Sequence, residues 1–154
     1  IVGGLLRENN LRLAVAESCT GGLIGHRLTN ISGSSDYFIE GVVTYSNDAK
    51  ANRLGVGEDL LARCGAVSRE VALAMADGVR KTAGADIGLA VTGIAGPTGA
   101  TPQKPLGLTF IAVSDKRNSH CEQFQFHQDR VRNKERAAQA ALNLLRQWLA
   151  KMGS

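Results

Sequence analysis

The sequence contains one arrangement twice: a short apolar run followed directly by a cluster of glycines. Residues 11–16 lead into the segment 17–22, and residues 86–92 lead into the segment 93–99. Apolar runs of this length are typical of strands that are buried on both faces of a sheet. Glycine lets the backbone turn sharply or approach a ligand closely, and 18 of the 154 residues are Gly. Because ligands bind at the carboxyl ends of strands in open α/β sheets, both clusters are expected to face one crevice.

The remaining elements are predicted by hydrophobic periodicity and by cap residues. Further strands are expected at residues 41–45, 106–113 and 122–126, the last two as an antiparallel pair around residues 115–118. Helices are expected at residues 23–28, 47–54, 69–83 and 129–151. We therefore predict a single α/β domain over residues 1–154, with a mixed sheet and helices on both faces.

The composition, 44% hydrophobic and 21% charged, is that of a soluble globular domain and excludes disordered and coiled-coil proteins. No apolar run approaches the ~20 residues of a transmembrane helix, and no secretory signal pattern is present. Three scattered cysteines, Cys19, Cys64 and Cys121, favour a reducing, cytoplasmic location. Because no set of residues has metal-ligand spacing, we expect neither a catalytic metal nor another cofactor. Since the sequence begins at Ile1 rather than Met, we expect it to be part of a longer protein.

The first candidate site is the segment 17–22, at a strand end that opens a helix. Ser18 lies where a nucleophile would lie, on a sharp strand-to-helix turn. The amides of Thr20, Gly21 and Gly22 are expected to be unpaired at the helix N-terminus, where they would bind a phosphate or a developing oxyanion. The alternative is that Ser18 and Thr20 merely cap the helix.

A serine nucleophile needs a base, because its hydroxyl is barely ionised at neutral pH. We expect the three histidines to lie away from the site, whereas Lys50 follows a strand end and could approach Ser18 across the sheet. A buried lysine can act as a base, because burial disfavours its charged form. Tyr45 could orient Lys50 or pass the proton. The alternative is that Lys50 is an ordinary solvated helix residue.

The second glycine cluster and a basic segment complete the set of candidate sites. Thr92, Gly93 and Gly96 begin a long loop whose glycines would let the backbone lie against a planar ligand, unless the loop is a simple connector. Residues 101–154 hold nine Lys and Arg against four Asp and Glu, concentrated in residues 130–136. This segment is either a solvated helix face or an anion site for a small ligand, since nucleic-acid binding would require more basic residues and interleaved aromatics.

Five motifs occur together and in a fixed order. They are Ala16-Glu-Ser-Cys-Thr-Gly-Gly22, Ser32-Gly-Ser-Ser35, Val43-Thr-Tyr-Ser-Asn47 with Lys50, Gly65-Ala-Val-Ser68 and Thr92-Gly-Ile-Ala-Gly-Pro97. In this order they resemble the C-terminal domain family of the competence/damage-inducible protein CinA, which includes stand-alone nicotinamide mononucleotide deamidases. The resemblance covers about residues 5–150.

The resemblance implies a three-layer α/β/α fold and hydrolysis of the amide of nicotinamide mononucleotide (NMN) to nicotinate mononucleotide and ammonia, a step of pyridine-nucleotide recycling. It implies a serine nucleophile, Ser18, assisted by Lys50 and Tyr45.

The substrate-binding positions that the resemblance implies are Thr20, Gly21, Gly22, Thr92, Gly93, Gly96, Arg130 and Lys134. Here Gln128 and Lys134 stand where the family commonly has Gly and a second Arg. Lysine keeps the positive charge but loses bidentate phosphate binding.

Two other function classes compete with a deamidase. One is a non-catalytic nucleotide-binding or regulatory module of a larger CinA-type protein, and the other is nucleic-acid binding through residues 130–136. We expect a small nucleotide as the partner rather than nucleic acid or a membrane, and a homodimer or higher homo-oligomer by default.

Overall fold

A computed structural model describes residues 1–153 and contains one mixed sheet of five strands in the order β2-β1-β3-β4-β5. The strands are β1 (Leu13–Glu17), β2 (Phe38–Val43), β3 (Ile87–Gly93), β4 (Leu108–Ser114) and β5 (Ser119–Gln125). β1 runs parallel to both of its neighbours, β2 and β3, while β4 is antiparallel to β3 and β5. The carboxyl ends of the three parallel strands therefore meet at one edge of the sheet.

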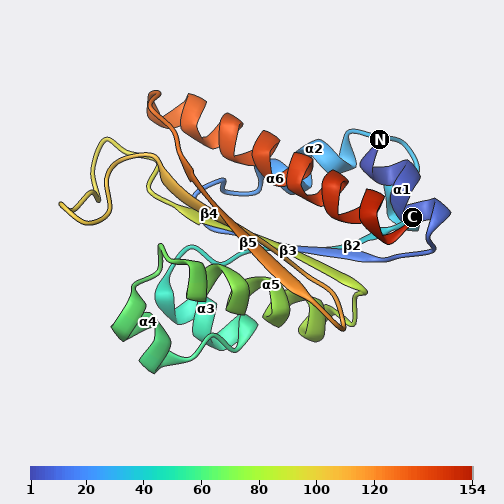
Figure 1. Cartoon of the computed structure of the whole chain (residues 1–154), viewed down its shortest axis with the longest axis horizontal. Coiled ribbons are helices and arrows are strands. Elements are labelled where there is room, and N and C mark those ends of the chain that lie inside the picture. Colours follow the sequence, from blue (N-terminus) through green and yellow to red (C-terminus); the bar gives the residue numbers. More distant parts are fainter. Residues whose placement is uncertain (154) are drawn as a thin grey trace.

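Helices cover both faces of this sheet, and Figure 1 shows the resulting three layers. One layer consists of α1 (Val2–Glu8), α2 (Leu23–Thr29) and α6 (Arg130–Met152), and the other of α3 (Asn47–Leu54), α4 (Glu58–Cys64) and α5 (Arg69–Ala83). The predicted three-layer α/β/α fold with a mixed sheet is confirmed. Within residues 1–153, no helix is both long and apolar enough to cross a membrane.

The two faces of the sheet differ in the size of their side chains. Leu13 and Val15 of β1 pack in the core beneath α6, whereas Ala14 and Ala16 face the core beneath α5. β3 repeats this alternation. Its large residues face α6, and its small residues, Gly88 and Ala90, face α5. Small residues permit close approach, and a Cβ added to Gly88 would lie only 2.0 Å from the carbonyl oxygen of Ala76 in α5. α5 thus packs almost directly on the backbone of the sheet.

Most of the predicted elements are present, with four differences. The antiparallel β4–β5 pair forms as expected, and Ser68 caps α5 through a hydrogen bond from the Val71 amide to its hydroxyl. The helices α1 and α4 and a 3₁₀ turn at Ser34–Asp36 were not predicted; each has seven residues or fewer, too short for a clear periodic pattern. β2 begins at Phe38 and ends at Val43, so Tyr45 lies beyond the strand that was expected to include it.

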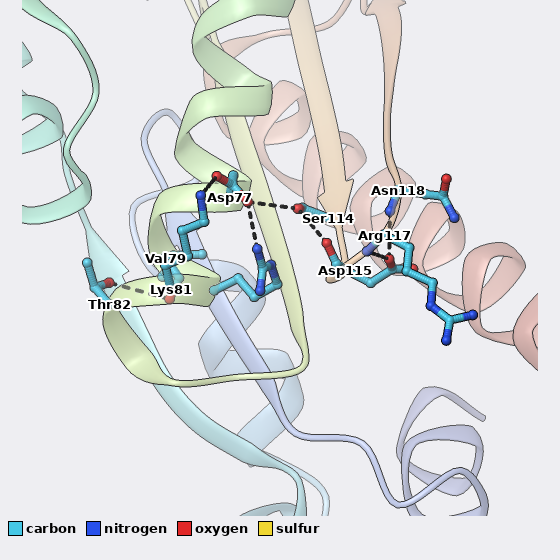
Figure 2. A network of polar contacts seen from close by, with 9 residues as sticks. Asp77, Val79, Lys81, Thr82, Ser114, Asp115, Arg117 and Asn118 are labelled. Carbon is cyan, nitrogen blue, oxygen red and sulfur yellow. Dashed lines mark hydrogen bonds and ion pairs between the residues drawn. The ribbon is translucent and has the colours of Figure 1, made fainter.

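A polar network lies at the edge of the sheet opposite the carboxyl ends of the parallel strands (Figure 2). Asp77 of α5 accepts ion pairs from Arg80 and Lys81, and Ser114 at the end of β4 donates to the same carboxylate. Burial alone would raise the pKa of Asp77, but the hydrogen bonds from Lys81 and Arg80 outweigh it and lower this pKa. The network joins α5 to the β4–β5 hairpin.

Two helical glycines offer a matched test of the close packing of α5. A Cβ at Gly78 would lie 2.1 Å from the Leu54 carbonyl oxygen, whereas a Cβ at Gly4 in α1 would meet nothing within 4 Å. We expect Gly78→Ala to lower the free energy of unfolding by about 1–3 kcal/mol through overpacking. Gly4→Ala should raise it by up to ~1 kcal/mol, because alanine favours helices over glycine.

Urea denaturation of both variants provides the measurement. Equal effects of the two substitutions would contradict close contact between α5 and the Leu54 carbonyl.

Candidate active site

The candidate site lies at the carboxyl ends of β1, β2 and β3. Hydrogen bonds beyond the regular strands hold these ends together: the Ser18 amide donates to the Val91 carbonyl at 3.1 Å, and the Thr44 amide donates to the Glu17 carbonyl at 2.9 Å. Ser18 therefore follows β1 on a turn whose backbone is fixed from both sides. Both glycine clusters follow strands that end at this edge of the sheet, as expected, but none of residues 93–99 lines the hollow beside the Ser18 turn.

Lys50 reaches this turn from α3. Ser46 caps α3 by accepting a hydrogen bond from the Ala49 amide, and Lys50 occupies the next position along the chain. Its residue is only 1% exposed, and its Nζ lies 3.1 Å from the Oγ of Ser18, which is 8% exposed. Lys50 is therefore a buried neighbour of Ser18 and not a solvated helix residue.

The other partners of the Lys50 amine are backbone carbonyl groups. Nζ donates to the carbonyl oxygens of Thr44 at 2.8 Å and of Tyr45 at 3.1 Å. Burial lowers the pKa of Lys50 below the ordinary lysine value, and an interaction with Cys19 opposes this shift. A neutral amine has two N–H groups and one lone pair. Nζ thus has three oxygen partners: the charged amine donates an N–H to each of them, and the neutral amine donates to the two carbonyl groups while its lone pair accepts from the Ser18 hydroxyl.

Cys19, directly after Ser18, has the opposite character. Burial raises the pKa of its thiol to about 12, an effect that a backbone hydrogen bond reduces only in part. Because the thiolate is the nucleophilic form of cysteine, this raised pKa makes Cys19 a poor nucleophile at neutral pH. A Cβ added to Gly93 would lie 3.1 Å from the Cys19 sulfur and 2.9 Å from the Leu108 carbonyl oxygen. Gly93 thus allows the end of β3 to pass close to the Ser18 turn.

The first turn of α2 differs from the prediction of free amides. The side chain of Glu17 is buried, and its Oε1 accepts hydrogen bonds from the Thr20 hydroxyl at 2.6 Å and from the Ile24 amide at 2.9 Å. Its Oε2 accepts from the Gly25 amide at 3.0 Å. The α2 N-terminus therefore already holds an anion, supplied by the chain itself.

Some amides of the turn remain available all the same. Gly21 donates to the Ser18 carbonyl, so this one of the three expected donors is engaged. Among residues 1–153, the amides of Thr20 and Gly22 have no acceptor. Both N–H groups are donors that the turn can offer to a ligand beside Ser18.

Arg130, the first residue of α6, connects two other segments of the site. Its Nη1 donates to the Gly96 carbonyl at 2.8 Å, and its Nη2 donates to the Tyr45 hydroxyl at 3.0 Å. The Tyr45 hydroxyl thus contacts Arg130, while the contact of Tyr45 with Lys50 is made by its backbone carbonyl. The structure brings Tyr45 to the site, but its side chain is 59% exposed and is directed to the guanidinium.

Asn133 is a site residue that the sequence reasoning missed. Its side chain is buried, its Nδ2 donates to the Ala95 carbonyl at 2.9 Å, and its Oδ1 accepts from the Gln128 amide at 3.0 Å. Asn133 and Arg130 together fix the loop after β3 against the start of α6. The signal in the sequence was a polar residue on the apolar stripe of the helix.

Thr92 and Lys104 hold the two ends of the same loop. The Thr92 side chain is buried and donates to the Ala66 carbonyl at 2.8 Å. Lys104 donates to the carbonyl oxygen of Cys64 at the end of α4. The hydroxyl of Thr92 is therefore engaged by the segment before α5, and the backbone at Gly93 and Gly96 forms the part of this loop nearest the site.

A hollow of about 380 Å³ lies beside the Ser18 turn, between α2 and α6. It is lined by Thr20, Gly21, Gly22, Leu23, His26, Val131, Lys134 and Glu135. Lys134 lies over Gly21, since a Cβ at Gly21 would be 3.5 Å from its Nζ. His26 was expected to lie far from the motifs, but it follows Gly22 by one helical turn and so lines this hollow. In the described chain, no three His, Cys, Asp or Glu residues gather closely enough to hold a metal ion.

Comparisons with known proteins identify the family of the chain. A sequence model described as the CinA C-terminal domain matches residues 1–149. The chain belongs to this family. It is 56% identical over 150 residues to a CinA-like protein of Syntrophus aciditrophicus, covering 97% of this chain and 36% of that protein. A putative competence-damage inducible protein of Caldicellulosiruptor saccharolyticus is 51% identical over 146 residues, 95% of this chain and 36% of that protein. The chain thus spans about a third of the length of these relatives.

Solved structures of the CinA superfamily share the fold. One from Klebsiella pneumoniae superimposes with a TM-score of 0.94 at 33% identity, covering 97% of this chain and 94% of the other. The competence/damage inducible protein CihA from Agrobacterium tumefaciens gives a TM-score of 0.87 at 40% identity, covering 94% and 93%. The CinA-type resemblance of the five motifs is therefore confirmed.

The burial of Cys19 leads to a prediction about thiol reactivity. Cys19 and Cys121 are buried, and burial raises their pKa values to about 12 and about 11, whereas Cys64 is half-buried. With iodoacetamide at pH 8, we expect Cys64 to react first and Cys19 to react only after unfolding. Peptide mass mapping over time is the measurement, with urea-unfolded protein as the control. Labelling of Cys19 at the rate of Cys64 in the folded protein would contradict this account of the site.

Proposed function

We propose that this CinA-family domain hydrolyses the carboxamide of NMN to nicotinate mononucleotide and ammonia through a covalent intermediate on Ser18. One observation carries the proposal: a buried lysine amine lies 3.1 Å from the hydroxyl of a serine on a tight strand-to-helix turn. Such a pair of nucleophile and base is the requirement of serine acyl-transfer chemistry, and simple nucleotide binding does not need it. NMN as the substrate comes from the family resemblance.

In the proposed first step, neutral Lys50 accepts the proton of Ser18 while Oγ attacks the carboxamide carbon. The two carbonyl groups that bind Nζ also stabilise the ammonium that forms, because their oxygen atoms carry partial negative charge. Lys50 then gives the proton to the departing amine, and ammonia leaves an acyl-enzyme ester. A water molecule, deprotonated by Lys50, hydrolyses this ester and restores Ser18.

The developing oxyanion needs hydrogen-bond donors that are already in place. The unpaired amides of Thr20 and Gly22 lie on the Ser18 turn, and they are the donors we assign to this role. The turn is held rigid by its neighbours, so the donors need little reorganisation during the reaction. This assignment gives the Thr-Gly-Gly part of the motif a function at the reacting carbon.

The phosphate of the nucleotide is assigned to the side chains of Lys134 and Arg130. Lys134 and His26 line the hollow beside Gly21, and Arg130 lies at the start of the same helix. Arginine has five N–H donors, so the two that bind Gly96 and Tyr45 leave others for a phosphate. Anchoring a distant group of the substrate orients the reacting group. Tyr45 then acts by holding Arg130 through its hydroxyl.

The direct test is release of ammonia from NMN by the purified domain without added metal. We expect turnover in the wild type and a loss on the order of 10³-fold or more in Ser18→Ala, because the nucleophile is absent. NMN binding, measured by calorimetry, should be retained in Ser18→Ala. Ser119→Ala, an exposed position on β5, serves as the control and should keep full activity.

Two results would contradict the proposal. Folded wild-type protein that binds NMN without releasing ammonia would favour a non-catalytic binding module. Retained turnover in Ser18→Ala would exclude Ser18 as the nucleophile.

The lowered pKa of Lys50 predicts the pH dependence of the reaction. Only the neutral amine can accept the proton of Ser18, so kcat/KM should rise with pH and reach a plateau above the pKa of Lys50. Because burial lowers this pKa, the midpoint should fall below the ordinary lysine value of ~10.4. Lys50→Arg should abolish turnover, since arginine stays protonated. Lys81→Arg, an exposed control on α5, should leave the profile unchanged. A midpoint at or above the ordinary lysine value, or turnover that Lys50→Arg leaves unchanged, would refute the role of Lys50.

A further inference from the structure

Glu17 is a buried carboxylate directly before the nucleophile, and the mechanism proposed above does not use it. Its residue is 2% exposed, and all of its side-chain hydrogen bonds go to the segment that follows Ser18. Buried carboxylates are rare unless they are satisfied by several donors. Three donors satisfy this one, and one of them, the Thr20 hydroxyl, makes the short bond of 2.6 Å.

These bonds enclose the Ser18 turn between two fixed points. The backbone carbonyl of Glu17 accepts from the Thr44 amide, which ties the end of β1 to the segment beyond β2. The carboxylate then binds the Ile24 and Gly25 amides in the first turn of α2. Residues 18–22 run between the two attachments, so a single side chain sets the distance between the strand end and the helix.

The same segment leads on to Lys50. Thr44, which donates to the Glu17 carbonyl, also gives its own carbonyl to the Lys50 amine at 2.8 Å. Glu17 therefore lies at the junction of the two chains that carry the nucleophile and the base. No charged group of the substrate needs to reach it, because Lys134 lines the hollow beside Gly21, whereas the carboxylate of Glu17 is bound by Thr20, Ile24 and Gly25.

We propose that Glu17 is a positioning residue for Ser18, whose carboxylate holds the residue 18–22 turn at the distance from Lys50 that the reaction needs. This inference rests on the proposed function, because its catalytic consequence requires Ser18 to be the nucleophile. A misplacement of about 1 Å can reduce a reaction rate on the order of 10²-fold. Loss of the carboxylate should therefore lower kcat, while KM, set by contacts at the phosphate end, should change little.

The variants Glu17→Gln and Glu17→Ala test the proposal. Glutamine keeps one acceptor but presents an NH₂ group to the N–H of Gly25 or Ile24, so one of the three bonds is lost. We expect kcat for ammonia release from NMN to fall on the order of 10- to 100-fold in Glu17→Gln, with KM changing less than about threefold. The midpoint of the Lys50 pH profile should stay in place. Glu40→Gln, on an exposed position of β2, is the matched control.

Formate supplies a second readout in Glu17→Ala. A small carboxylate can enter the space left by the side chain and bind the same donors, so added formate should restore part of the lost kcat. Formate should not stimulate the wild type or Ser18→Ala. Rescue of this kind distinguishes a local carboxylate requirement from general destabilisation.

Hydrogen exchange tests the role of Glu17 independently of whether the domain hydrolyses NMN. In Glu17→Gln the amide that faces the new NH₂ group, Gly25 or Ile24, should exchange faster than in the wild type, whether or not the protein turns over NMN. A wild type that releases no ammonia would refute the proposed function, while this exchange result would still report on the turn. Unchanged exchange, or a folded Glu17→Gln with kcat within twofold of the wild type, would overturn the role of Glu17. If neither Glu17 variant folds, Thr20→Val, which removes only the 2.6 Å bond, must lower kcat, and an unchanged kcat would overturn it.

Discussion

The site depends on the parallel pairing of β1 with both β2 and β3. Parallel strands end at the same edge of a sheet, so the pairing of the strands is enough to bring together the segments that follow them. The pairing continues past the regular strands through the Ser18 amide and the Thr44 amide. Ser18, the two carbonyl groups beside Lys50 and the glycine loop after β3 all take their positions from these bonds. The antiparallel β4 and β5 widen the sheet and contribute no residue to the Ser18–Lys50 pair.

The two layers of helices serve this edge in different ways. α5 packs against small residues and lies close to the sheet. The end of α3, the helix that carries Lys50, packs in turn against α5 at Gly78. α6 packs against large residues on the opposite face, and its first turn reaches the site through Arg130 and Asn133. One layer therefore presents the Lys50 amine to Ser18, and the other presents Lys134 to the hollow beside Gly21.

Much of the fold could be predicted, because long apolar runs, glycine stops and the Ser68 cap are local signals. The proximity of Lys50 to Ser18 could also be anticipated, since both follow strand ends. The role of Glu17 could not, because nothing in the sequence shows that a charged residue after an apolar run will turn back to bind the amides of the next helix. Asn133 and the contact between Tyr45 and Arg130 were missed for a similar reason. They depend on the approach of α6, which begins 85 residues after Tyr45, to the strand ends.

Apart from the Ser18 hydroxyl, the partners of the Lys50 amine are main-chain carbonyl groups, and this has a consequence for variation in the protein. A lysine whose partner is a carboxylate side chain loses that partner when a single residue is substituted. The oxygen atoms of Thr44 and Tyr45 belong to the backbone, so replacing either side chain leaves them in place as long as the chain follows the same path. The polar surroundings of the amine therefore persist as long as the backbone keeps its path, and substitutions of the neighbouring side chains do not remove them.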